Sequence, residues 1–189
     1  MSQKSFVEKL EYNPVVAAVK SWEGLKKSLD SECGIVFCLF GSIVEIPKIV
    51  DELKINNKLT FIHLDLVDGL SPKEAAVDYV RAYTKADGII STKANLVRYA
   101  SALGLLTVQR FFILDSIAMR NTLRQLPEIA ADAIEILPGI MPKIFREVAK
   151  LTKKPIIAGG LISDKEDILS ALEAGATAIS STSEELWFI

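Results

Sequence analysis

The sequence is poor in the residues that build metal and nucleophile sites. It contains one histidine, His63, and two cysteines, Cys33 and Cys38, among 189 residues. A single histidine excludes a metal site made of several histidines, and a Ser-His-Asp arrangement would have to use His63 itself. The cysteines lack CxxC spacing, and Cys38 lies in an apolar run where cysteine acts as a small apolar residue. We expect no disulfide, no metal and no other cofactor, and the reducing cytoplasm as the setting.

Membrane and secretion signals are also absent from the sequence. Half of the residues are hydrophobic, but no apolar run approaches the ~18 residues that a membrane helix needs. The N-terminal segment MSQKSFVEKLE is charged and helix-like, and it lacks the apolar core and cleavage site of a secretory signal. These features predict a cytoplasmic protein without a membrane partner.

Charge and known motifs give little indication of a nucleotide or nucleic-acid partner. The net charge is −2, and no Walker loop, dinucleotide fingerprint, arginine-rich run or RNP aromatic pattern is present. The charges are unevenly distributed, however. Residues 93–154 carry ten Lys and Arg against five Asp and Glu, and the rest of the chain carries twelve against nineteen. Chance clustering on solvated helix faces and a basic binding face are both open explanations.

What the chain does contain is eight short apolar runs that alternate with segments of helical spacing. Strands that alternate with helices imply right-handed crossovers and a parallel sheet, and eight units close a (β/α)₈ TIM-type barrel. The chain is short against the ~250 residues of a typical barrel, so we predict one compact α/β domain over residues 1–189. The runs are Val15–Val19, Gly34–Phe40, Leu59–Leu66, Gly88–Thr92, Leu106–Leu114, Ala133–Leu137, Pro155–Gly160 and Ala178–Thr182.

Several helix ends can also be predicted. Ser71, followed by Pro72 and Glu74, has the pattern of a helix N-cap, and Asp164 offers another. Gly104 and Gly175 stand where a left-handed residue ends a helix. After the eighth run only a short segment ending in LWFI remains, so we predict a truncated last helix and a buried apolar C-terminus.

The loops after the last two strands predict a phosphate site. In barrels of this type the working site lies at the C-terminal ends of the strands, and phosphate often binds the loops after strands seven and eight. Glycines there let the backbone approach an oxyanion, and a following helix start adds partial positive charge. Tight turns and a plain N-cap at Ser183 are the alternative explanation. The predicted phosphate ligands are Gly159, Gly160, Ser181, Thr182 and Ser183.

Carboxylates at other strand ends predict a second, polar part of the site. Asp65 and Asp68 follow the third run, where Asp65 shares a strand face with His63, and Glu135 lies within the sixth. A buried carboxylate must be paired, and Lys93 and Arg110 are the available partners of Glu135. Hydroxyl recognition, acid–base chemistry and an ion-pair network that only fills the barrel mouth are all compatible with this set. Nothing in the spacing requires a magnesium ion.

The sequence resembles the glycerol uptake operon antiterminators, which are glycerol-3-phosphate-responsive regulators. The resemblance runs from about residue 13 to the C-terminus, in register and in order. It is carried by HLDLVDGLSPKEAAVDYV, DGIISTK, QRFFILDS, EILPGIMPKI, IIAGGLI and AGATAISSTSEELW.

The resemblance implies a regulator, not an enzyme, that binds glycerol 3-phosphate and acts on the leader mRNA of glycerol genes to prevent transcription termination. It places the phosphate on Gly159, Gly160, Ser181 and Thr182, and the glycerol end toward Asp65, Lys93, Arg110 or Glu135. Assembly into a homo-oligomer is a possibility that the sequence leaves open.

Apart from the resemblance, one stripe of basic residues is the only feature of the sequence that supports RNA binding. Arg120 and Arg124 are four apart on one expected helix, and Lys143, Arg146 and Lys150 recur at three and four on the next. An enzyme of the isomerase or epimerase type, acting on a sugar phosphate, is the main alternative. A regulator that acts on a protein partner is another, because the fold alone does not decide function.

Overall fold

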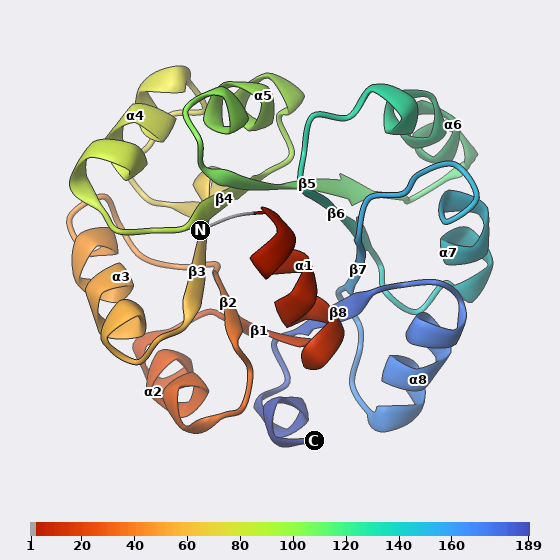
Figure 1. Ribbon diagram of the computed structural model, residues 1–189, viewed down its shortest axis with the longest axis horizontal. Helices are drawn as coiled ribbons and strands as arrows, with labels where there is room; N and C mark the ends of the chain where they lie inside the picture. Colours follow the sequence, from red (N-terminus) through yellow and green to blue (C-terminus); the bar gives the residue numbers. More distant parts are fainter. Residues whose placement is uncertain (1–2) are drawn as a thin grey trace.

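Eight parallel strands close into a barrel in the computed structural model, which describes residues 3–189 (Figure 1). Each strand pairs in parallel with the next, and β1 pairs with β8. The predicted (β/α)₈ barrel is therefore confirmed. The strands are β1 (Val15–Val19), β2 (Ile35–Cys38), β3 (Leu59–His63), β4 (Gly88–Ser91), β5 (Leu106–Phe112), β6 (Ala133–Leu137), β7 (Ile156–Gly159) and β8 (Ala178–Ser181).

A ring of helices covers the outside of the barrel, because each strand but the last is followed by a helix with one apolar face. After β8 the chain forms only the short 3₁₀ helix η3 (Glu184–Phe188), which confirms the truncated last helix. No helix within residues 3–189 is long and apolar enough to cross a membrane. The ring consists of α2 (Trp22–Asp30), α3 (Ile46–Ile55), α4 (Glu74–Tyr83), α5 (Ala94–Ala102), α6 (Ser116–Gln125), α7 (Pro142–Val148) and α8 (Lys165–Glu173).

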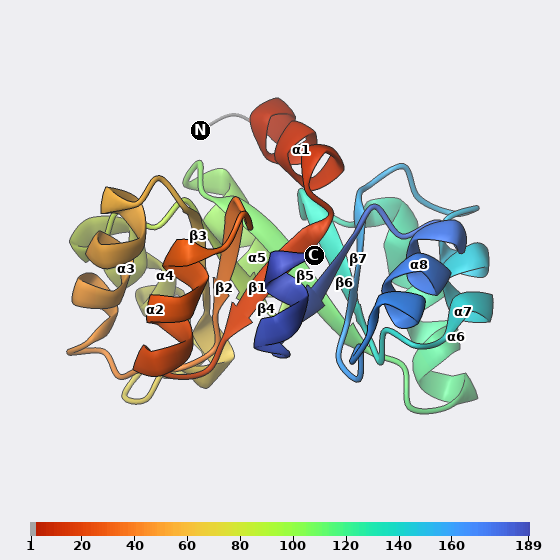
Figure 2. The same ribbon diagram turned by 90° about the horizontal axis from the view of Figure 1, so that it is seen from below.

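An additional helix, α1 (Gln3–Tyr12), lies across the end of the barrel where the strands begin (Figure 2). Its Phe6 and Leu10 are fully buried, and the ring of Phe6 lies 5.0 Å from that of Phe61 inside the barrel. The helix-like N-terminus is thus confirmed from Gln3 onward, and residues 1 and 2 lie outside the described residues. Because α1 covers this end, the opposite end, where the strands finish, is the one left for a ligand.

The interior of the barrel is apolar near α1 and polar at the opposite end. Every second residue of a strand points into the barrel. On β6, Ala133 belongs to the interior apolar cluster, so Glu135 is the next residue that points inward. Four inward side chains at the strand ends are polar and buried: His63, Arg110, Glu135 and Ser180. This polar layer forms the floor of the mouth.

Several strands end earlier than predicted. The third stops at His63, because residues Leu64–Leu66 turn into a 3₁₀ helix, η1, that brings Asp65 across to the end of β4. The second run ends as a strand at Cys38, and the fifth at Phe112. After β2 and β5 one more residue donates a cross-strand bond, from Leu39 N to Val19 O and from Ile113 N to Leu137 O, each at 2.8 Å. The apolar runs continue beyond these bonds, so hydrophobicity alone overestimates the strand.

One predicted helix start is wrong. Helix α4 begins at Glu74 with Lys73 at its N-cap position, because the Ser71 carbonyl accepts a bond from Lys73 N and forms a turn of its own. Asp164 caps α8 as predicted, and Gly104 and Gly175 have the positive φ angles, 79° and 105°, of helix-ending residues. The C-terminal segment is buried only at Leu186 and Trp187, since Phe188 and Ile189 are exposed.

Candidate functional site

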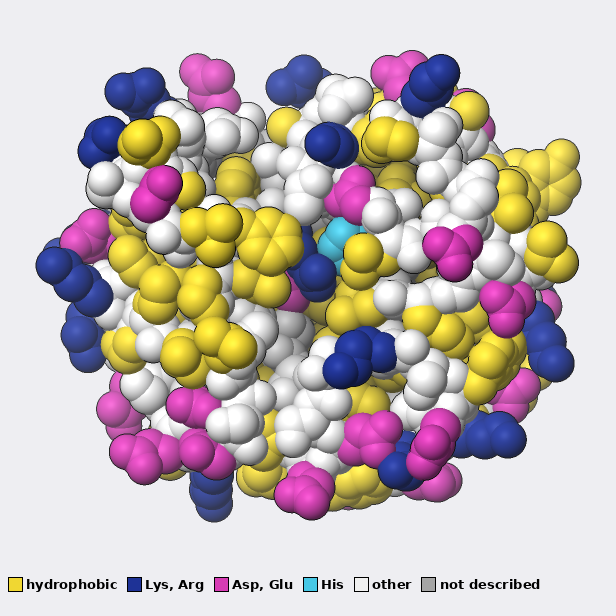
Figure 3. All heavy atoms as spheres, turned by 180° about the vertical axis from the view of Figure 1, so that it is seen from behind, with side chains coloured by type: hydrophobic (Ala, Val, Ile, Leu, Met, Phe, Trp, Pro, Cys, Tyr) yellow, Lys and Arg dark blue, Asp and Glu magenta, His cyan; other side chains and the backbone are white. Residues whose placement is uncertain are grey.

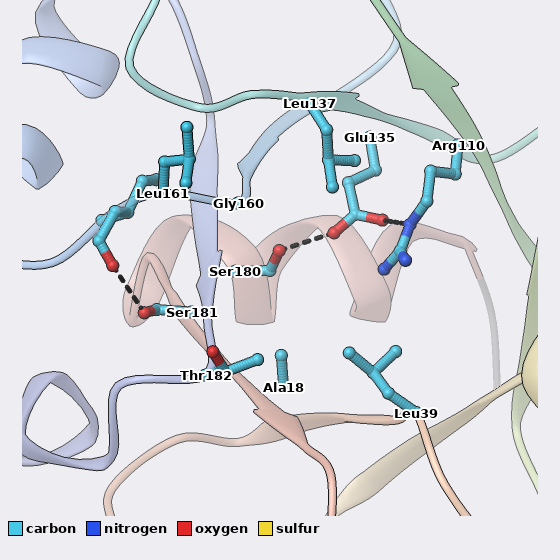
Figure 4. A pocket seen from close by; sticks show the side chains of 11 residues that line it. Ala18, Leu39, Arg110, Glu135, Leu137, Gly160, Leu161, Ser180, Ser181 and Thr182 are labelled. Atoms are coloured by element: carbon cyan, nitrogen blue, oxygen red, sulfur yellow. Dashed lines mark hydrogen bonds and ion pairs between the residues drawn. The ribbon is translucent and has the colours of Figure 1, made fainter.

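A small cavity of about 100 Å³ opens at the mouth, between the ends of β5, β6, β7 and β8 (Figure 4). Two groups of predicted residues meet in it: Gly160, Ser181 and Thr182 from the phosphate set, and Arg110 and Glu135 from the polar set. The remaining lining residues are Ala18, Leu39, Leu137, Leu161, Ile162 and Ser180.

The loop after β7 has an unusual backbone. Gly160 and Leu161 both have positive φ angles, of 74° and 62°. Leucine rarely adopts this conformation, and such residues cluster at ligand sites. The backbone N–H groups of Leu161 and Thr182 donate no hydrogen bond within residues 3–189. Two free donors therefore belong to residues that line the cavity.

Ser181 holds the two loops together. Its hydroxyl donates to the Ile162 carbonyl at 2.9 Å and accepts from the Ser183 backbone at 3.1 Å, while its carbonyl accepts from Trp187 Nε1 at 2.9 Å. Its one proton is thus already used, which leaves donation to an anion to the backbone and to Thr182. Ser183 lies at the N-cap position of η3, but its hydroxyl makes no capping bond.

Gly159 makes room for a buried carboxylate. A Cβ atom at this position would lie 2.7 Å from Glu135 Oε1 and 2.8 Å from Ser180 Oγ. Gly159 is not among the residues that line the cavity. The lack of a side chain there serves the contact between Glu135 and Ser180, a reason that the sequence did not reveal.

Glu135 is fixed from both sides. Arg110 Nε donates to Oε2 and Ser180 Oγ donates to Oε1, each at 2.5 Å, and all three residues are buried. Charge-assisted bonds of this kind are the strong ones. The predicted pairing of Arg110 with Glu135 is therefore present, and Figure 4 shows the two terminal nitrogens of Arg110 pointing into the cavity. Ser180 was missed as a partner, although its inward position two residues after Ala178 is a usable signal.

Asp65 and Lys93 lie toward β3 and β4 and do not line the cavity. The Asp65 carboxylate accepts bonds from Thr92 N at 2.7 Å and from Ser91 Oγ at 3.1 Å, so it holds the loop after β4. Lys93 is exposed and stands at the N-cap position of α5. The predicted polar set is thus divided between the cavity and the neighbouring side of the mouth.

His63 is a further polar residue of the mouth, for which the sequence predicted a strand face shared with Asp65 but no place in the ligand site. Its side chain is buried, and Nδ1 lies 3.8 Å from Asp65 Oδ2. Burial, and next the positive charge of Arg110, lower the pKa of His63 to about 4, although Asp65 acts in the opposite direction. The imidazole is therefore neutral near pH 7. Within the described chain, no group of three or more His, Cys, Asp or Glu residues is arranged to hold a metal.

Comparison with known proteins identifies the family. A family model described as glycerol-3-phosphate responsive antiterminator matches residues 15–187. The chain belongs to this family. The resemblance seen in the sequence motifs is thereby confirmed.

One curated relative and two solved structures are similar to nearly the whole chain. The uncharacterized protein YgcP of Escherichia coli (strain K12) is 44% identical over 178 residues, which cover 94% of this chain and 93% of that protein. The crystal structure of the glycerol uptake operon antiterminator regulatory protein from Listeria monocytogenes is 29% identical, with a TM-score of 0.87 over 92% of this chain and 94% of that one. A glycerol uptake operon antiterminator-related protein from Thermotoga maritima is 31% identical, with a TM-score of 0.82 over 93% of this chain and 98% of that one. Barrel enzymes at 10–16% identity share the fold alone.

The basic residues of this antiterminator family member lie on two consecutive outer helices. Arg120 and Arg124 are exposed on α6, and Lys143 and Arg146 are exposed on α7. None of the four appears in an ion pair among residues 3–189. Lys150 is also exposed. The prediction that it continues the helical stripe of Lys143 and Arg146 is wrong. Helix α7 ends at Val148, because the chain must turn back toward β7.

The mouth is bordered by exposed apolar side chains. Figure 3 looks onto this face and shows hydrophobic side chains beside a central hollow that holds histidine, basic and acidic groups. The exposed apolar residues at this end are Phe112 at the end of β5, Ile117 in the first turn of α6, and Leu114, Ile140 and Leu161 in the loops after β5, β6 and β7.

Proposed function

We propose that this protein is a glycerol-gene regulator that binds glycerol 3-phosphate in the mouth cavity and leader mRNA on its basic helices, causing transcription antitermination. The observation that supports ligand binding is the cavity itself, in which the loops after β7 and β8 face the guanidinium of Arg110. A partner that is nascent mRNA requires a cytoplasmic protein, which agrees with the setting expected from the cysteines.

The phosphate part of the ligand fits the β7–β8 side of the cavity. An oxyanion needs several N–H or O–H donors and some positive charge. The free backbone N–H groups of Leu161 and Thr182, the Thr182 hydroxyl and the terminal nitrogens of Arg110 supply both. Gly160 and Ser181 shape the loops that carry these donors. Participation of Gly159 and Ser183 as direct ligands stays a prediction.

The glycerol part then extends toward the middle of the mouth. Glu135 is anchored by Arg110 and Ser180, so it orients Arg110 for the ligand. Asp65 and Lys93 lie on the far side, where a hydroxyl would meet them. This arrangement separates the recognition of phosphate from the recognition of hydroxyl.

The RNA part rests on charge and on the family. Four unpaired basic side chains on neighbouring helices provide the phosphate contacts that dominate nucleic-acid affinity. Relatives named as antiterminators support an RNA target for this chain as well.

The enzyme alternative is weaker because of how Glu135 is held. An acid–base residue must exchange a proton with the substrate, and both oxygens of Glu135 already accept hydrogen bonds from Arg110 and Ser180. We therefore assign Glu135 a positioning function. Turnover of a sugar phosphate that is lost in Asp65→Asn or Glu135→Gln would favour the enzyme instead.

Calorimetric titration with glycerol 3-phosphate, followed by leader-RNA binding with and without it, tests the proposal. Thr182→Asp adds a negative charge to the cavity rim at an exposed position, and we expect it to abolish ligand binding. Ser71→Asp, at an exposed position on the loop after β3, is the matched control and should bind normally. Unchanged affinity in a folded Thr182→Asp protein would refute the placement of the phosphate.

A further inference from the structure

His63 carries the one buried side-chain nitrogen or oxygen without a hydrogen-bond partner in residues 3–189. This atom is Nδ1, and the residue is only 2% exposed. Nε2 makes no hydrogen bond within these residues either, so the whole imidazole is unpaired. Buried polar atoms are nearly always paired, because an unpaired one has lost its water without gaining a partner. An unpaired imidazole in the mouth of a ligand-binding barrel therefore points to a function in binding.

The position of His63 places it in the same polar layer as the cavity residues. It follows Leu59 and Phe61 on the inward face of β3, and both of these belong to the interior cluster. Arg110, Glu135 and Ser180 occupy the inward positions at the same ends of their strands. Figure 3 shows the histidine in the hollow at the centre of this face.

The surroundings of His63 determine which nitrogen holds the proton. Asp65 and Arg110 are the charged groups that act on it. Arg110 opposes a second proton, so the ring is neutral. The Asp65 carboxylate lies on the Nδ1 side, at 3.8 Å, which is too far for a hydrogen bond but favours the tautomer with hydrogen on Nδ1. Nε2 then keeps its lone pair and can only accept.

We propose that His63 is a specificity-determining residue whose Nε2 accepts a hydrogen bond from a hydroxyl of the phosphate ester bound in the cavity. This inference rests on the proposed function and adds how the hydroxyl end is recognised. A ligand hydroxyl is a donor and matches an acceptor-only nitrogen. A phosphate ester without a hydroxyl leaves the imidazole unpaired and is disfavoured.

The single histidine makes a direct test possible. Protein without an affinity tag, labelled with ¹⁵N-histidine, gives imidazole signals from His63 alone. Between pH 6 and 8 we expect the spectrum of a neutral ring with hydrogen on Nδ1. Glycerol 3-phosphate should shift the Nε2 resonance upfield, as happens when this nitrogen accepts a hydrogen bond. Propyl phosphate, which has the same carbon chain without hydroxyls, and inorganic phosphate should leave it in place.

The second part of the test compares, by calorimetry, the affinities of the unmodified protein and its variants for glycerol 3-phosphate and propyl phosphate. The loss of one neutral hydrogen bond corresponds to about a tenfold change, so His63→Phe should bind glycerol 3-phosphate about tenfold more weakly and propyl phosphate as before. Asp65→Asn should reduce the preference for glycerol 3-phosphate in the same direction. Asp30→Asn, at an exposed position at the end of α2, is the matched control and should keep the preference.

The outcomes separate this inference from the proposed function. If glycerol 3-phosphate binds but the Nε2 resonance stays fixed and His63→Phe keeps the preference, the assignment of His63 is wrong and the proposed function stands. If neither phosphate ester binds the unmodified protein, both are overturned. The spectroscopic arm uses the unmodified protein, so the inference can be refuted even if His63→Phe does not fold.

Discussion

At the scale of single residues, the mouth is built on one close contact that a glycine permits. Glu135 reaches Ser180 across the position where a Gly159 side chain would stand. The contact fixes the carboxylate, and the carboxylate fixes Arg110, which faces the cavity at the mouth. A substitution at Gly159 should therefore reach Arg110, the residue proposed to bind the phosphate, through Glu135.

We predict that Gly159→Ala destabilises the protein by about 1–3 kcal/mol, because the added methyl group must displace the Glu135 carboxylate from a packed site. Gly34→Ala is the matched control. Its Cβ would have Lys9 Nζ, at 3.7 Å, as its nearest neighbour, so its effect should stay within about 0.5 kcal/mol. Urea denaturation of both variants measures the difference, and equal stabilities would show that the mouth tolerates the methyl group.

A second residue-scale prediction concerns acid. The pKa of His63 is about 4 in the folded protein against an ordinary value of about 6.5. As pH falls below 6.5 the unfolded chain takes up a proton that the folded protein refuses, so stability decreases until the pH passes the folded pKa. Between pH 7 and 5 this linkage costs about 2 kcal/mol.

Denaturation curves of the unmodified protein and of His63→Phe at pH 7 and pH 5 isolate this contribution, since the carboxylates titrate in both proteins. The variant should lose about 2 kcal/mol less than the parent. The same loss in both would mean that His63 is protonated in the fold.

At the scale of elements, the alternation of apolar runs and helical segments was sufficient to predict the barrel, but not where its strands end. Phe40, Leu64 and Leu114 extend apolar runs beyond the strands, and the cross-strand hydrogen bonds that hold the strands are not visible in a sequence. The same limit applies to the site. Residues at strand ends could be named, whereas the role of Gly159 and the isolation of His63 depend on neighbours from other strands.

The basic helices allow a prediction at this scale. Replacing Arg120, Arg124, Lys143 and Arg146 with Gln removes four phosphate contacts and should flatten the log–log salt dependence of RNA binding by up to about 3 units. Glycerol 3-phosphate affinity should not change, because none of the four lines the cavity. Filter binding over a salt series provides the slope.

A variant with four exposed basic residues replaced elsewhere, at Lys26, Lys73, Arg81 and Lys165, controls for net charge. An equal flattening in the control would show diffuse attraction with no defined RNA face.

At the scale of the whole molecule, the ligand cavity and the basic face are joined by one short stretch of chain. Strand β5 carries Arg110 in the cavity and leads directly into α6, whose N-cap Asp115 accepts bonds from Ile117 N and Ala118 N at 2.8 and 2.7 Å. We therefore expect a movement of Arg110 toward a bound phosphate to reach the helix that carries Arg120 and Arg124. This connection makes the loop after β5 the natural coupling element.

Ligand and RNA should consequently strengthen each other's binding. Glycerol 3-phosphate at a hundredfold excess over its dissociation constant should stabilise the fold by about 2.7 kcal/mol, while glycerol should have little effect. If glycerol 3-phosphate tightens RNA binding by some factor, RNA must tighten glycerol 3-phosphate binding by the same factor, because the two binding steps close one thermodynamic cycle. Asp115→Ala loosens the start of α6 and should bring this factor toward one while each partner still binds alone. A factor that Asp115→Ala leaves unchanged would place the coupling outside the loop after β5, and a factor of one in the unmodified protein would separate the ligand site from the basic face.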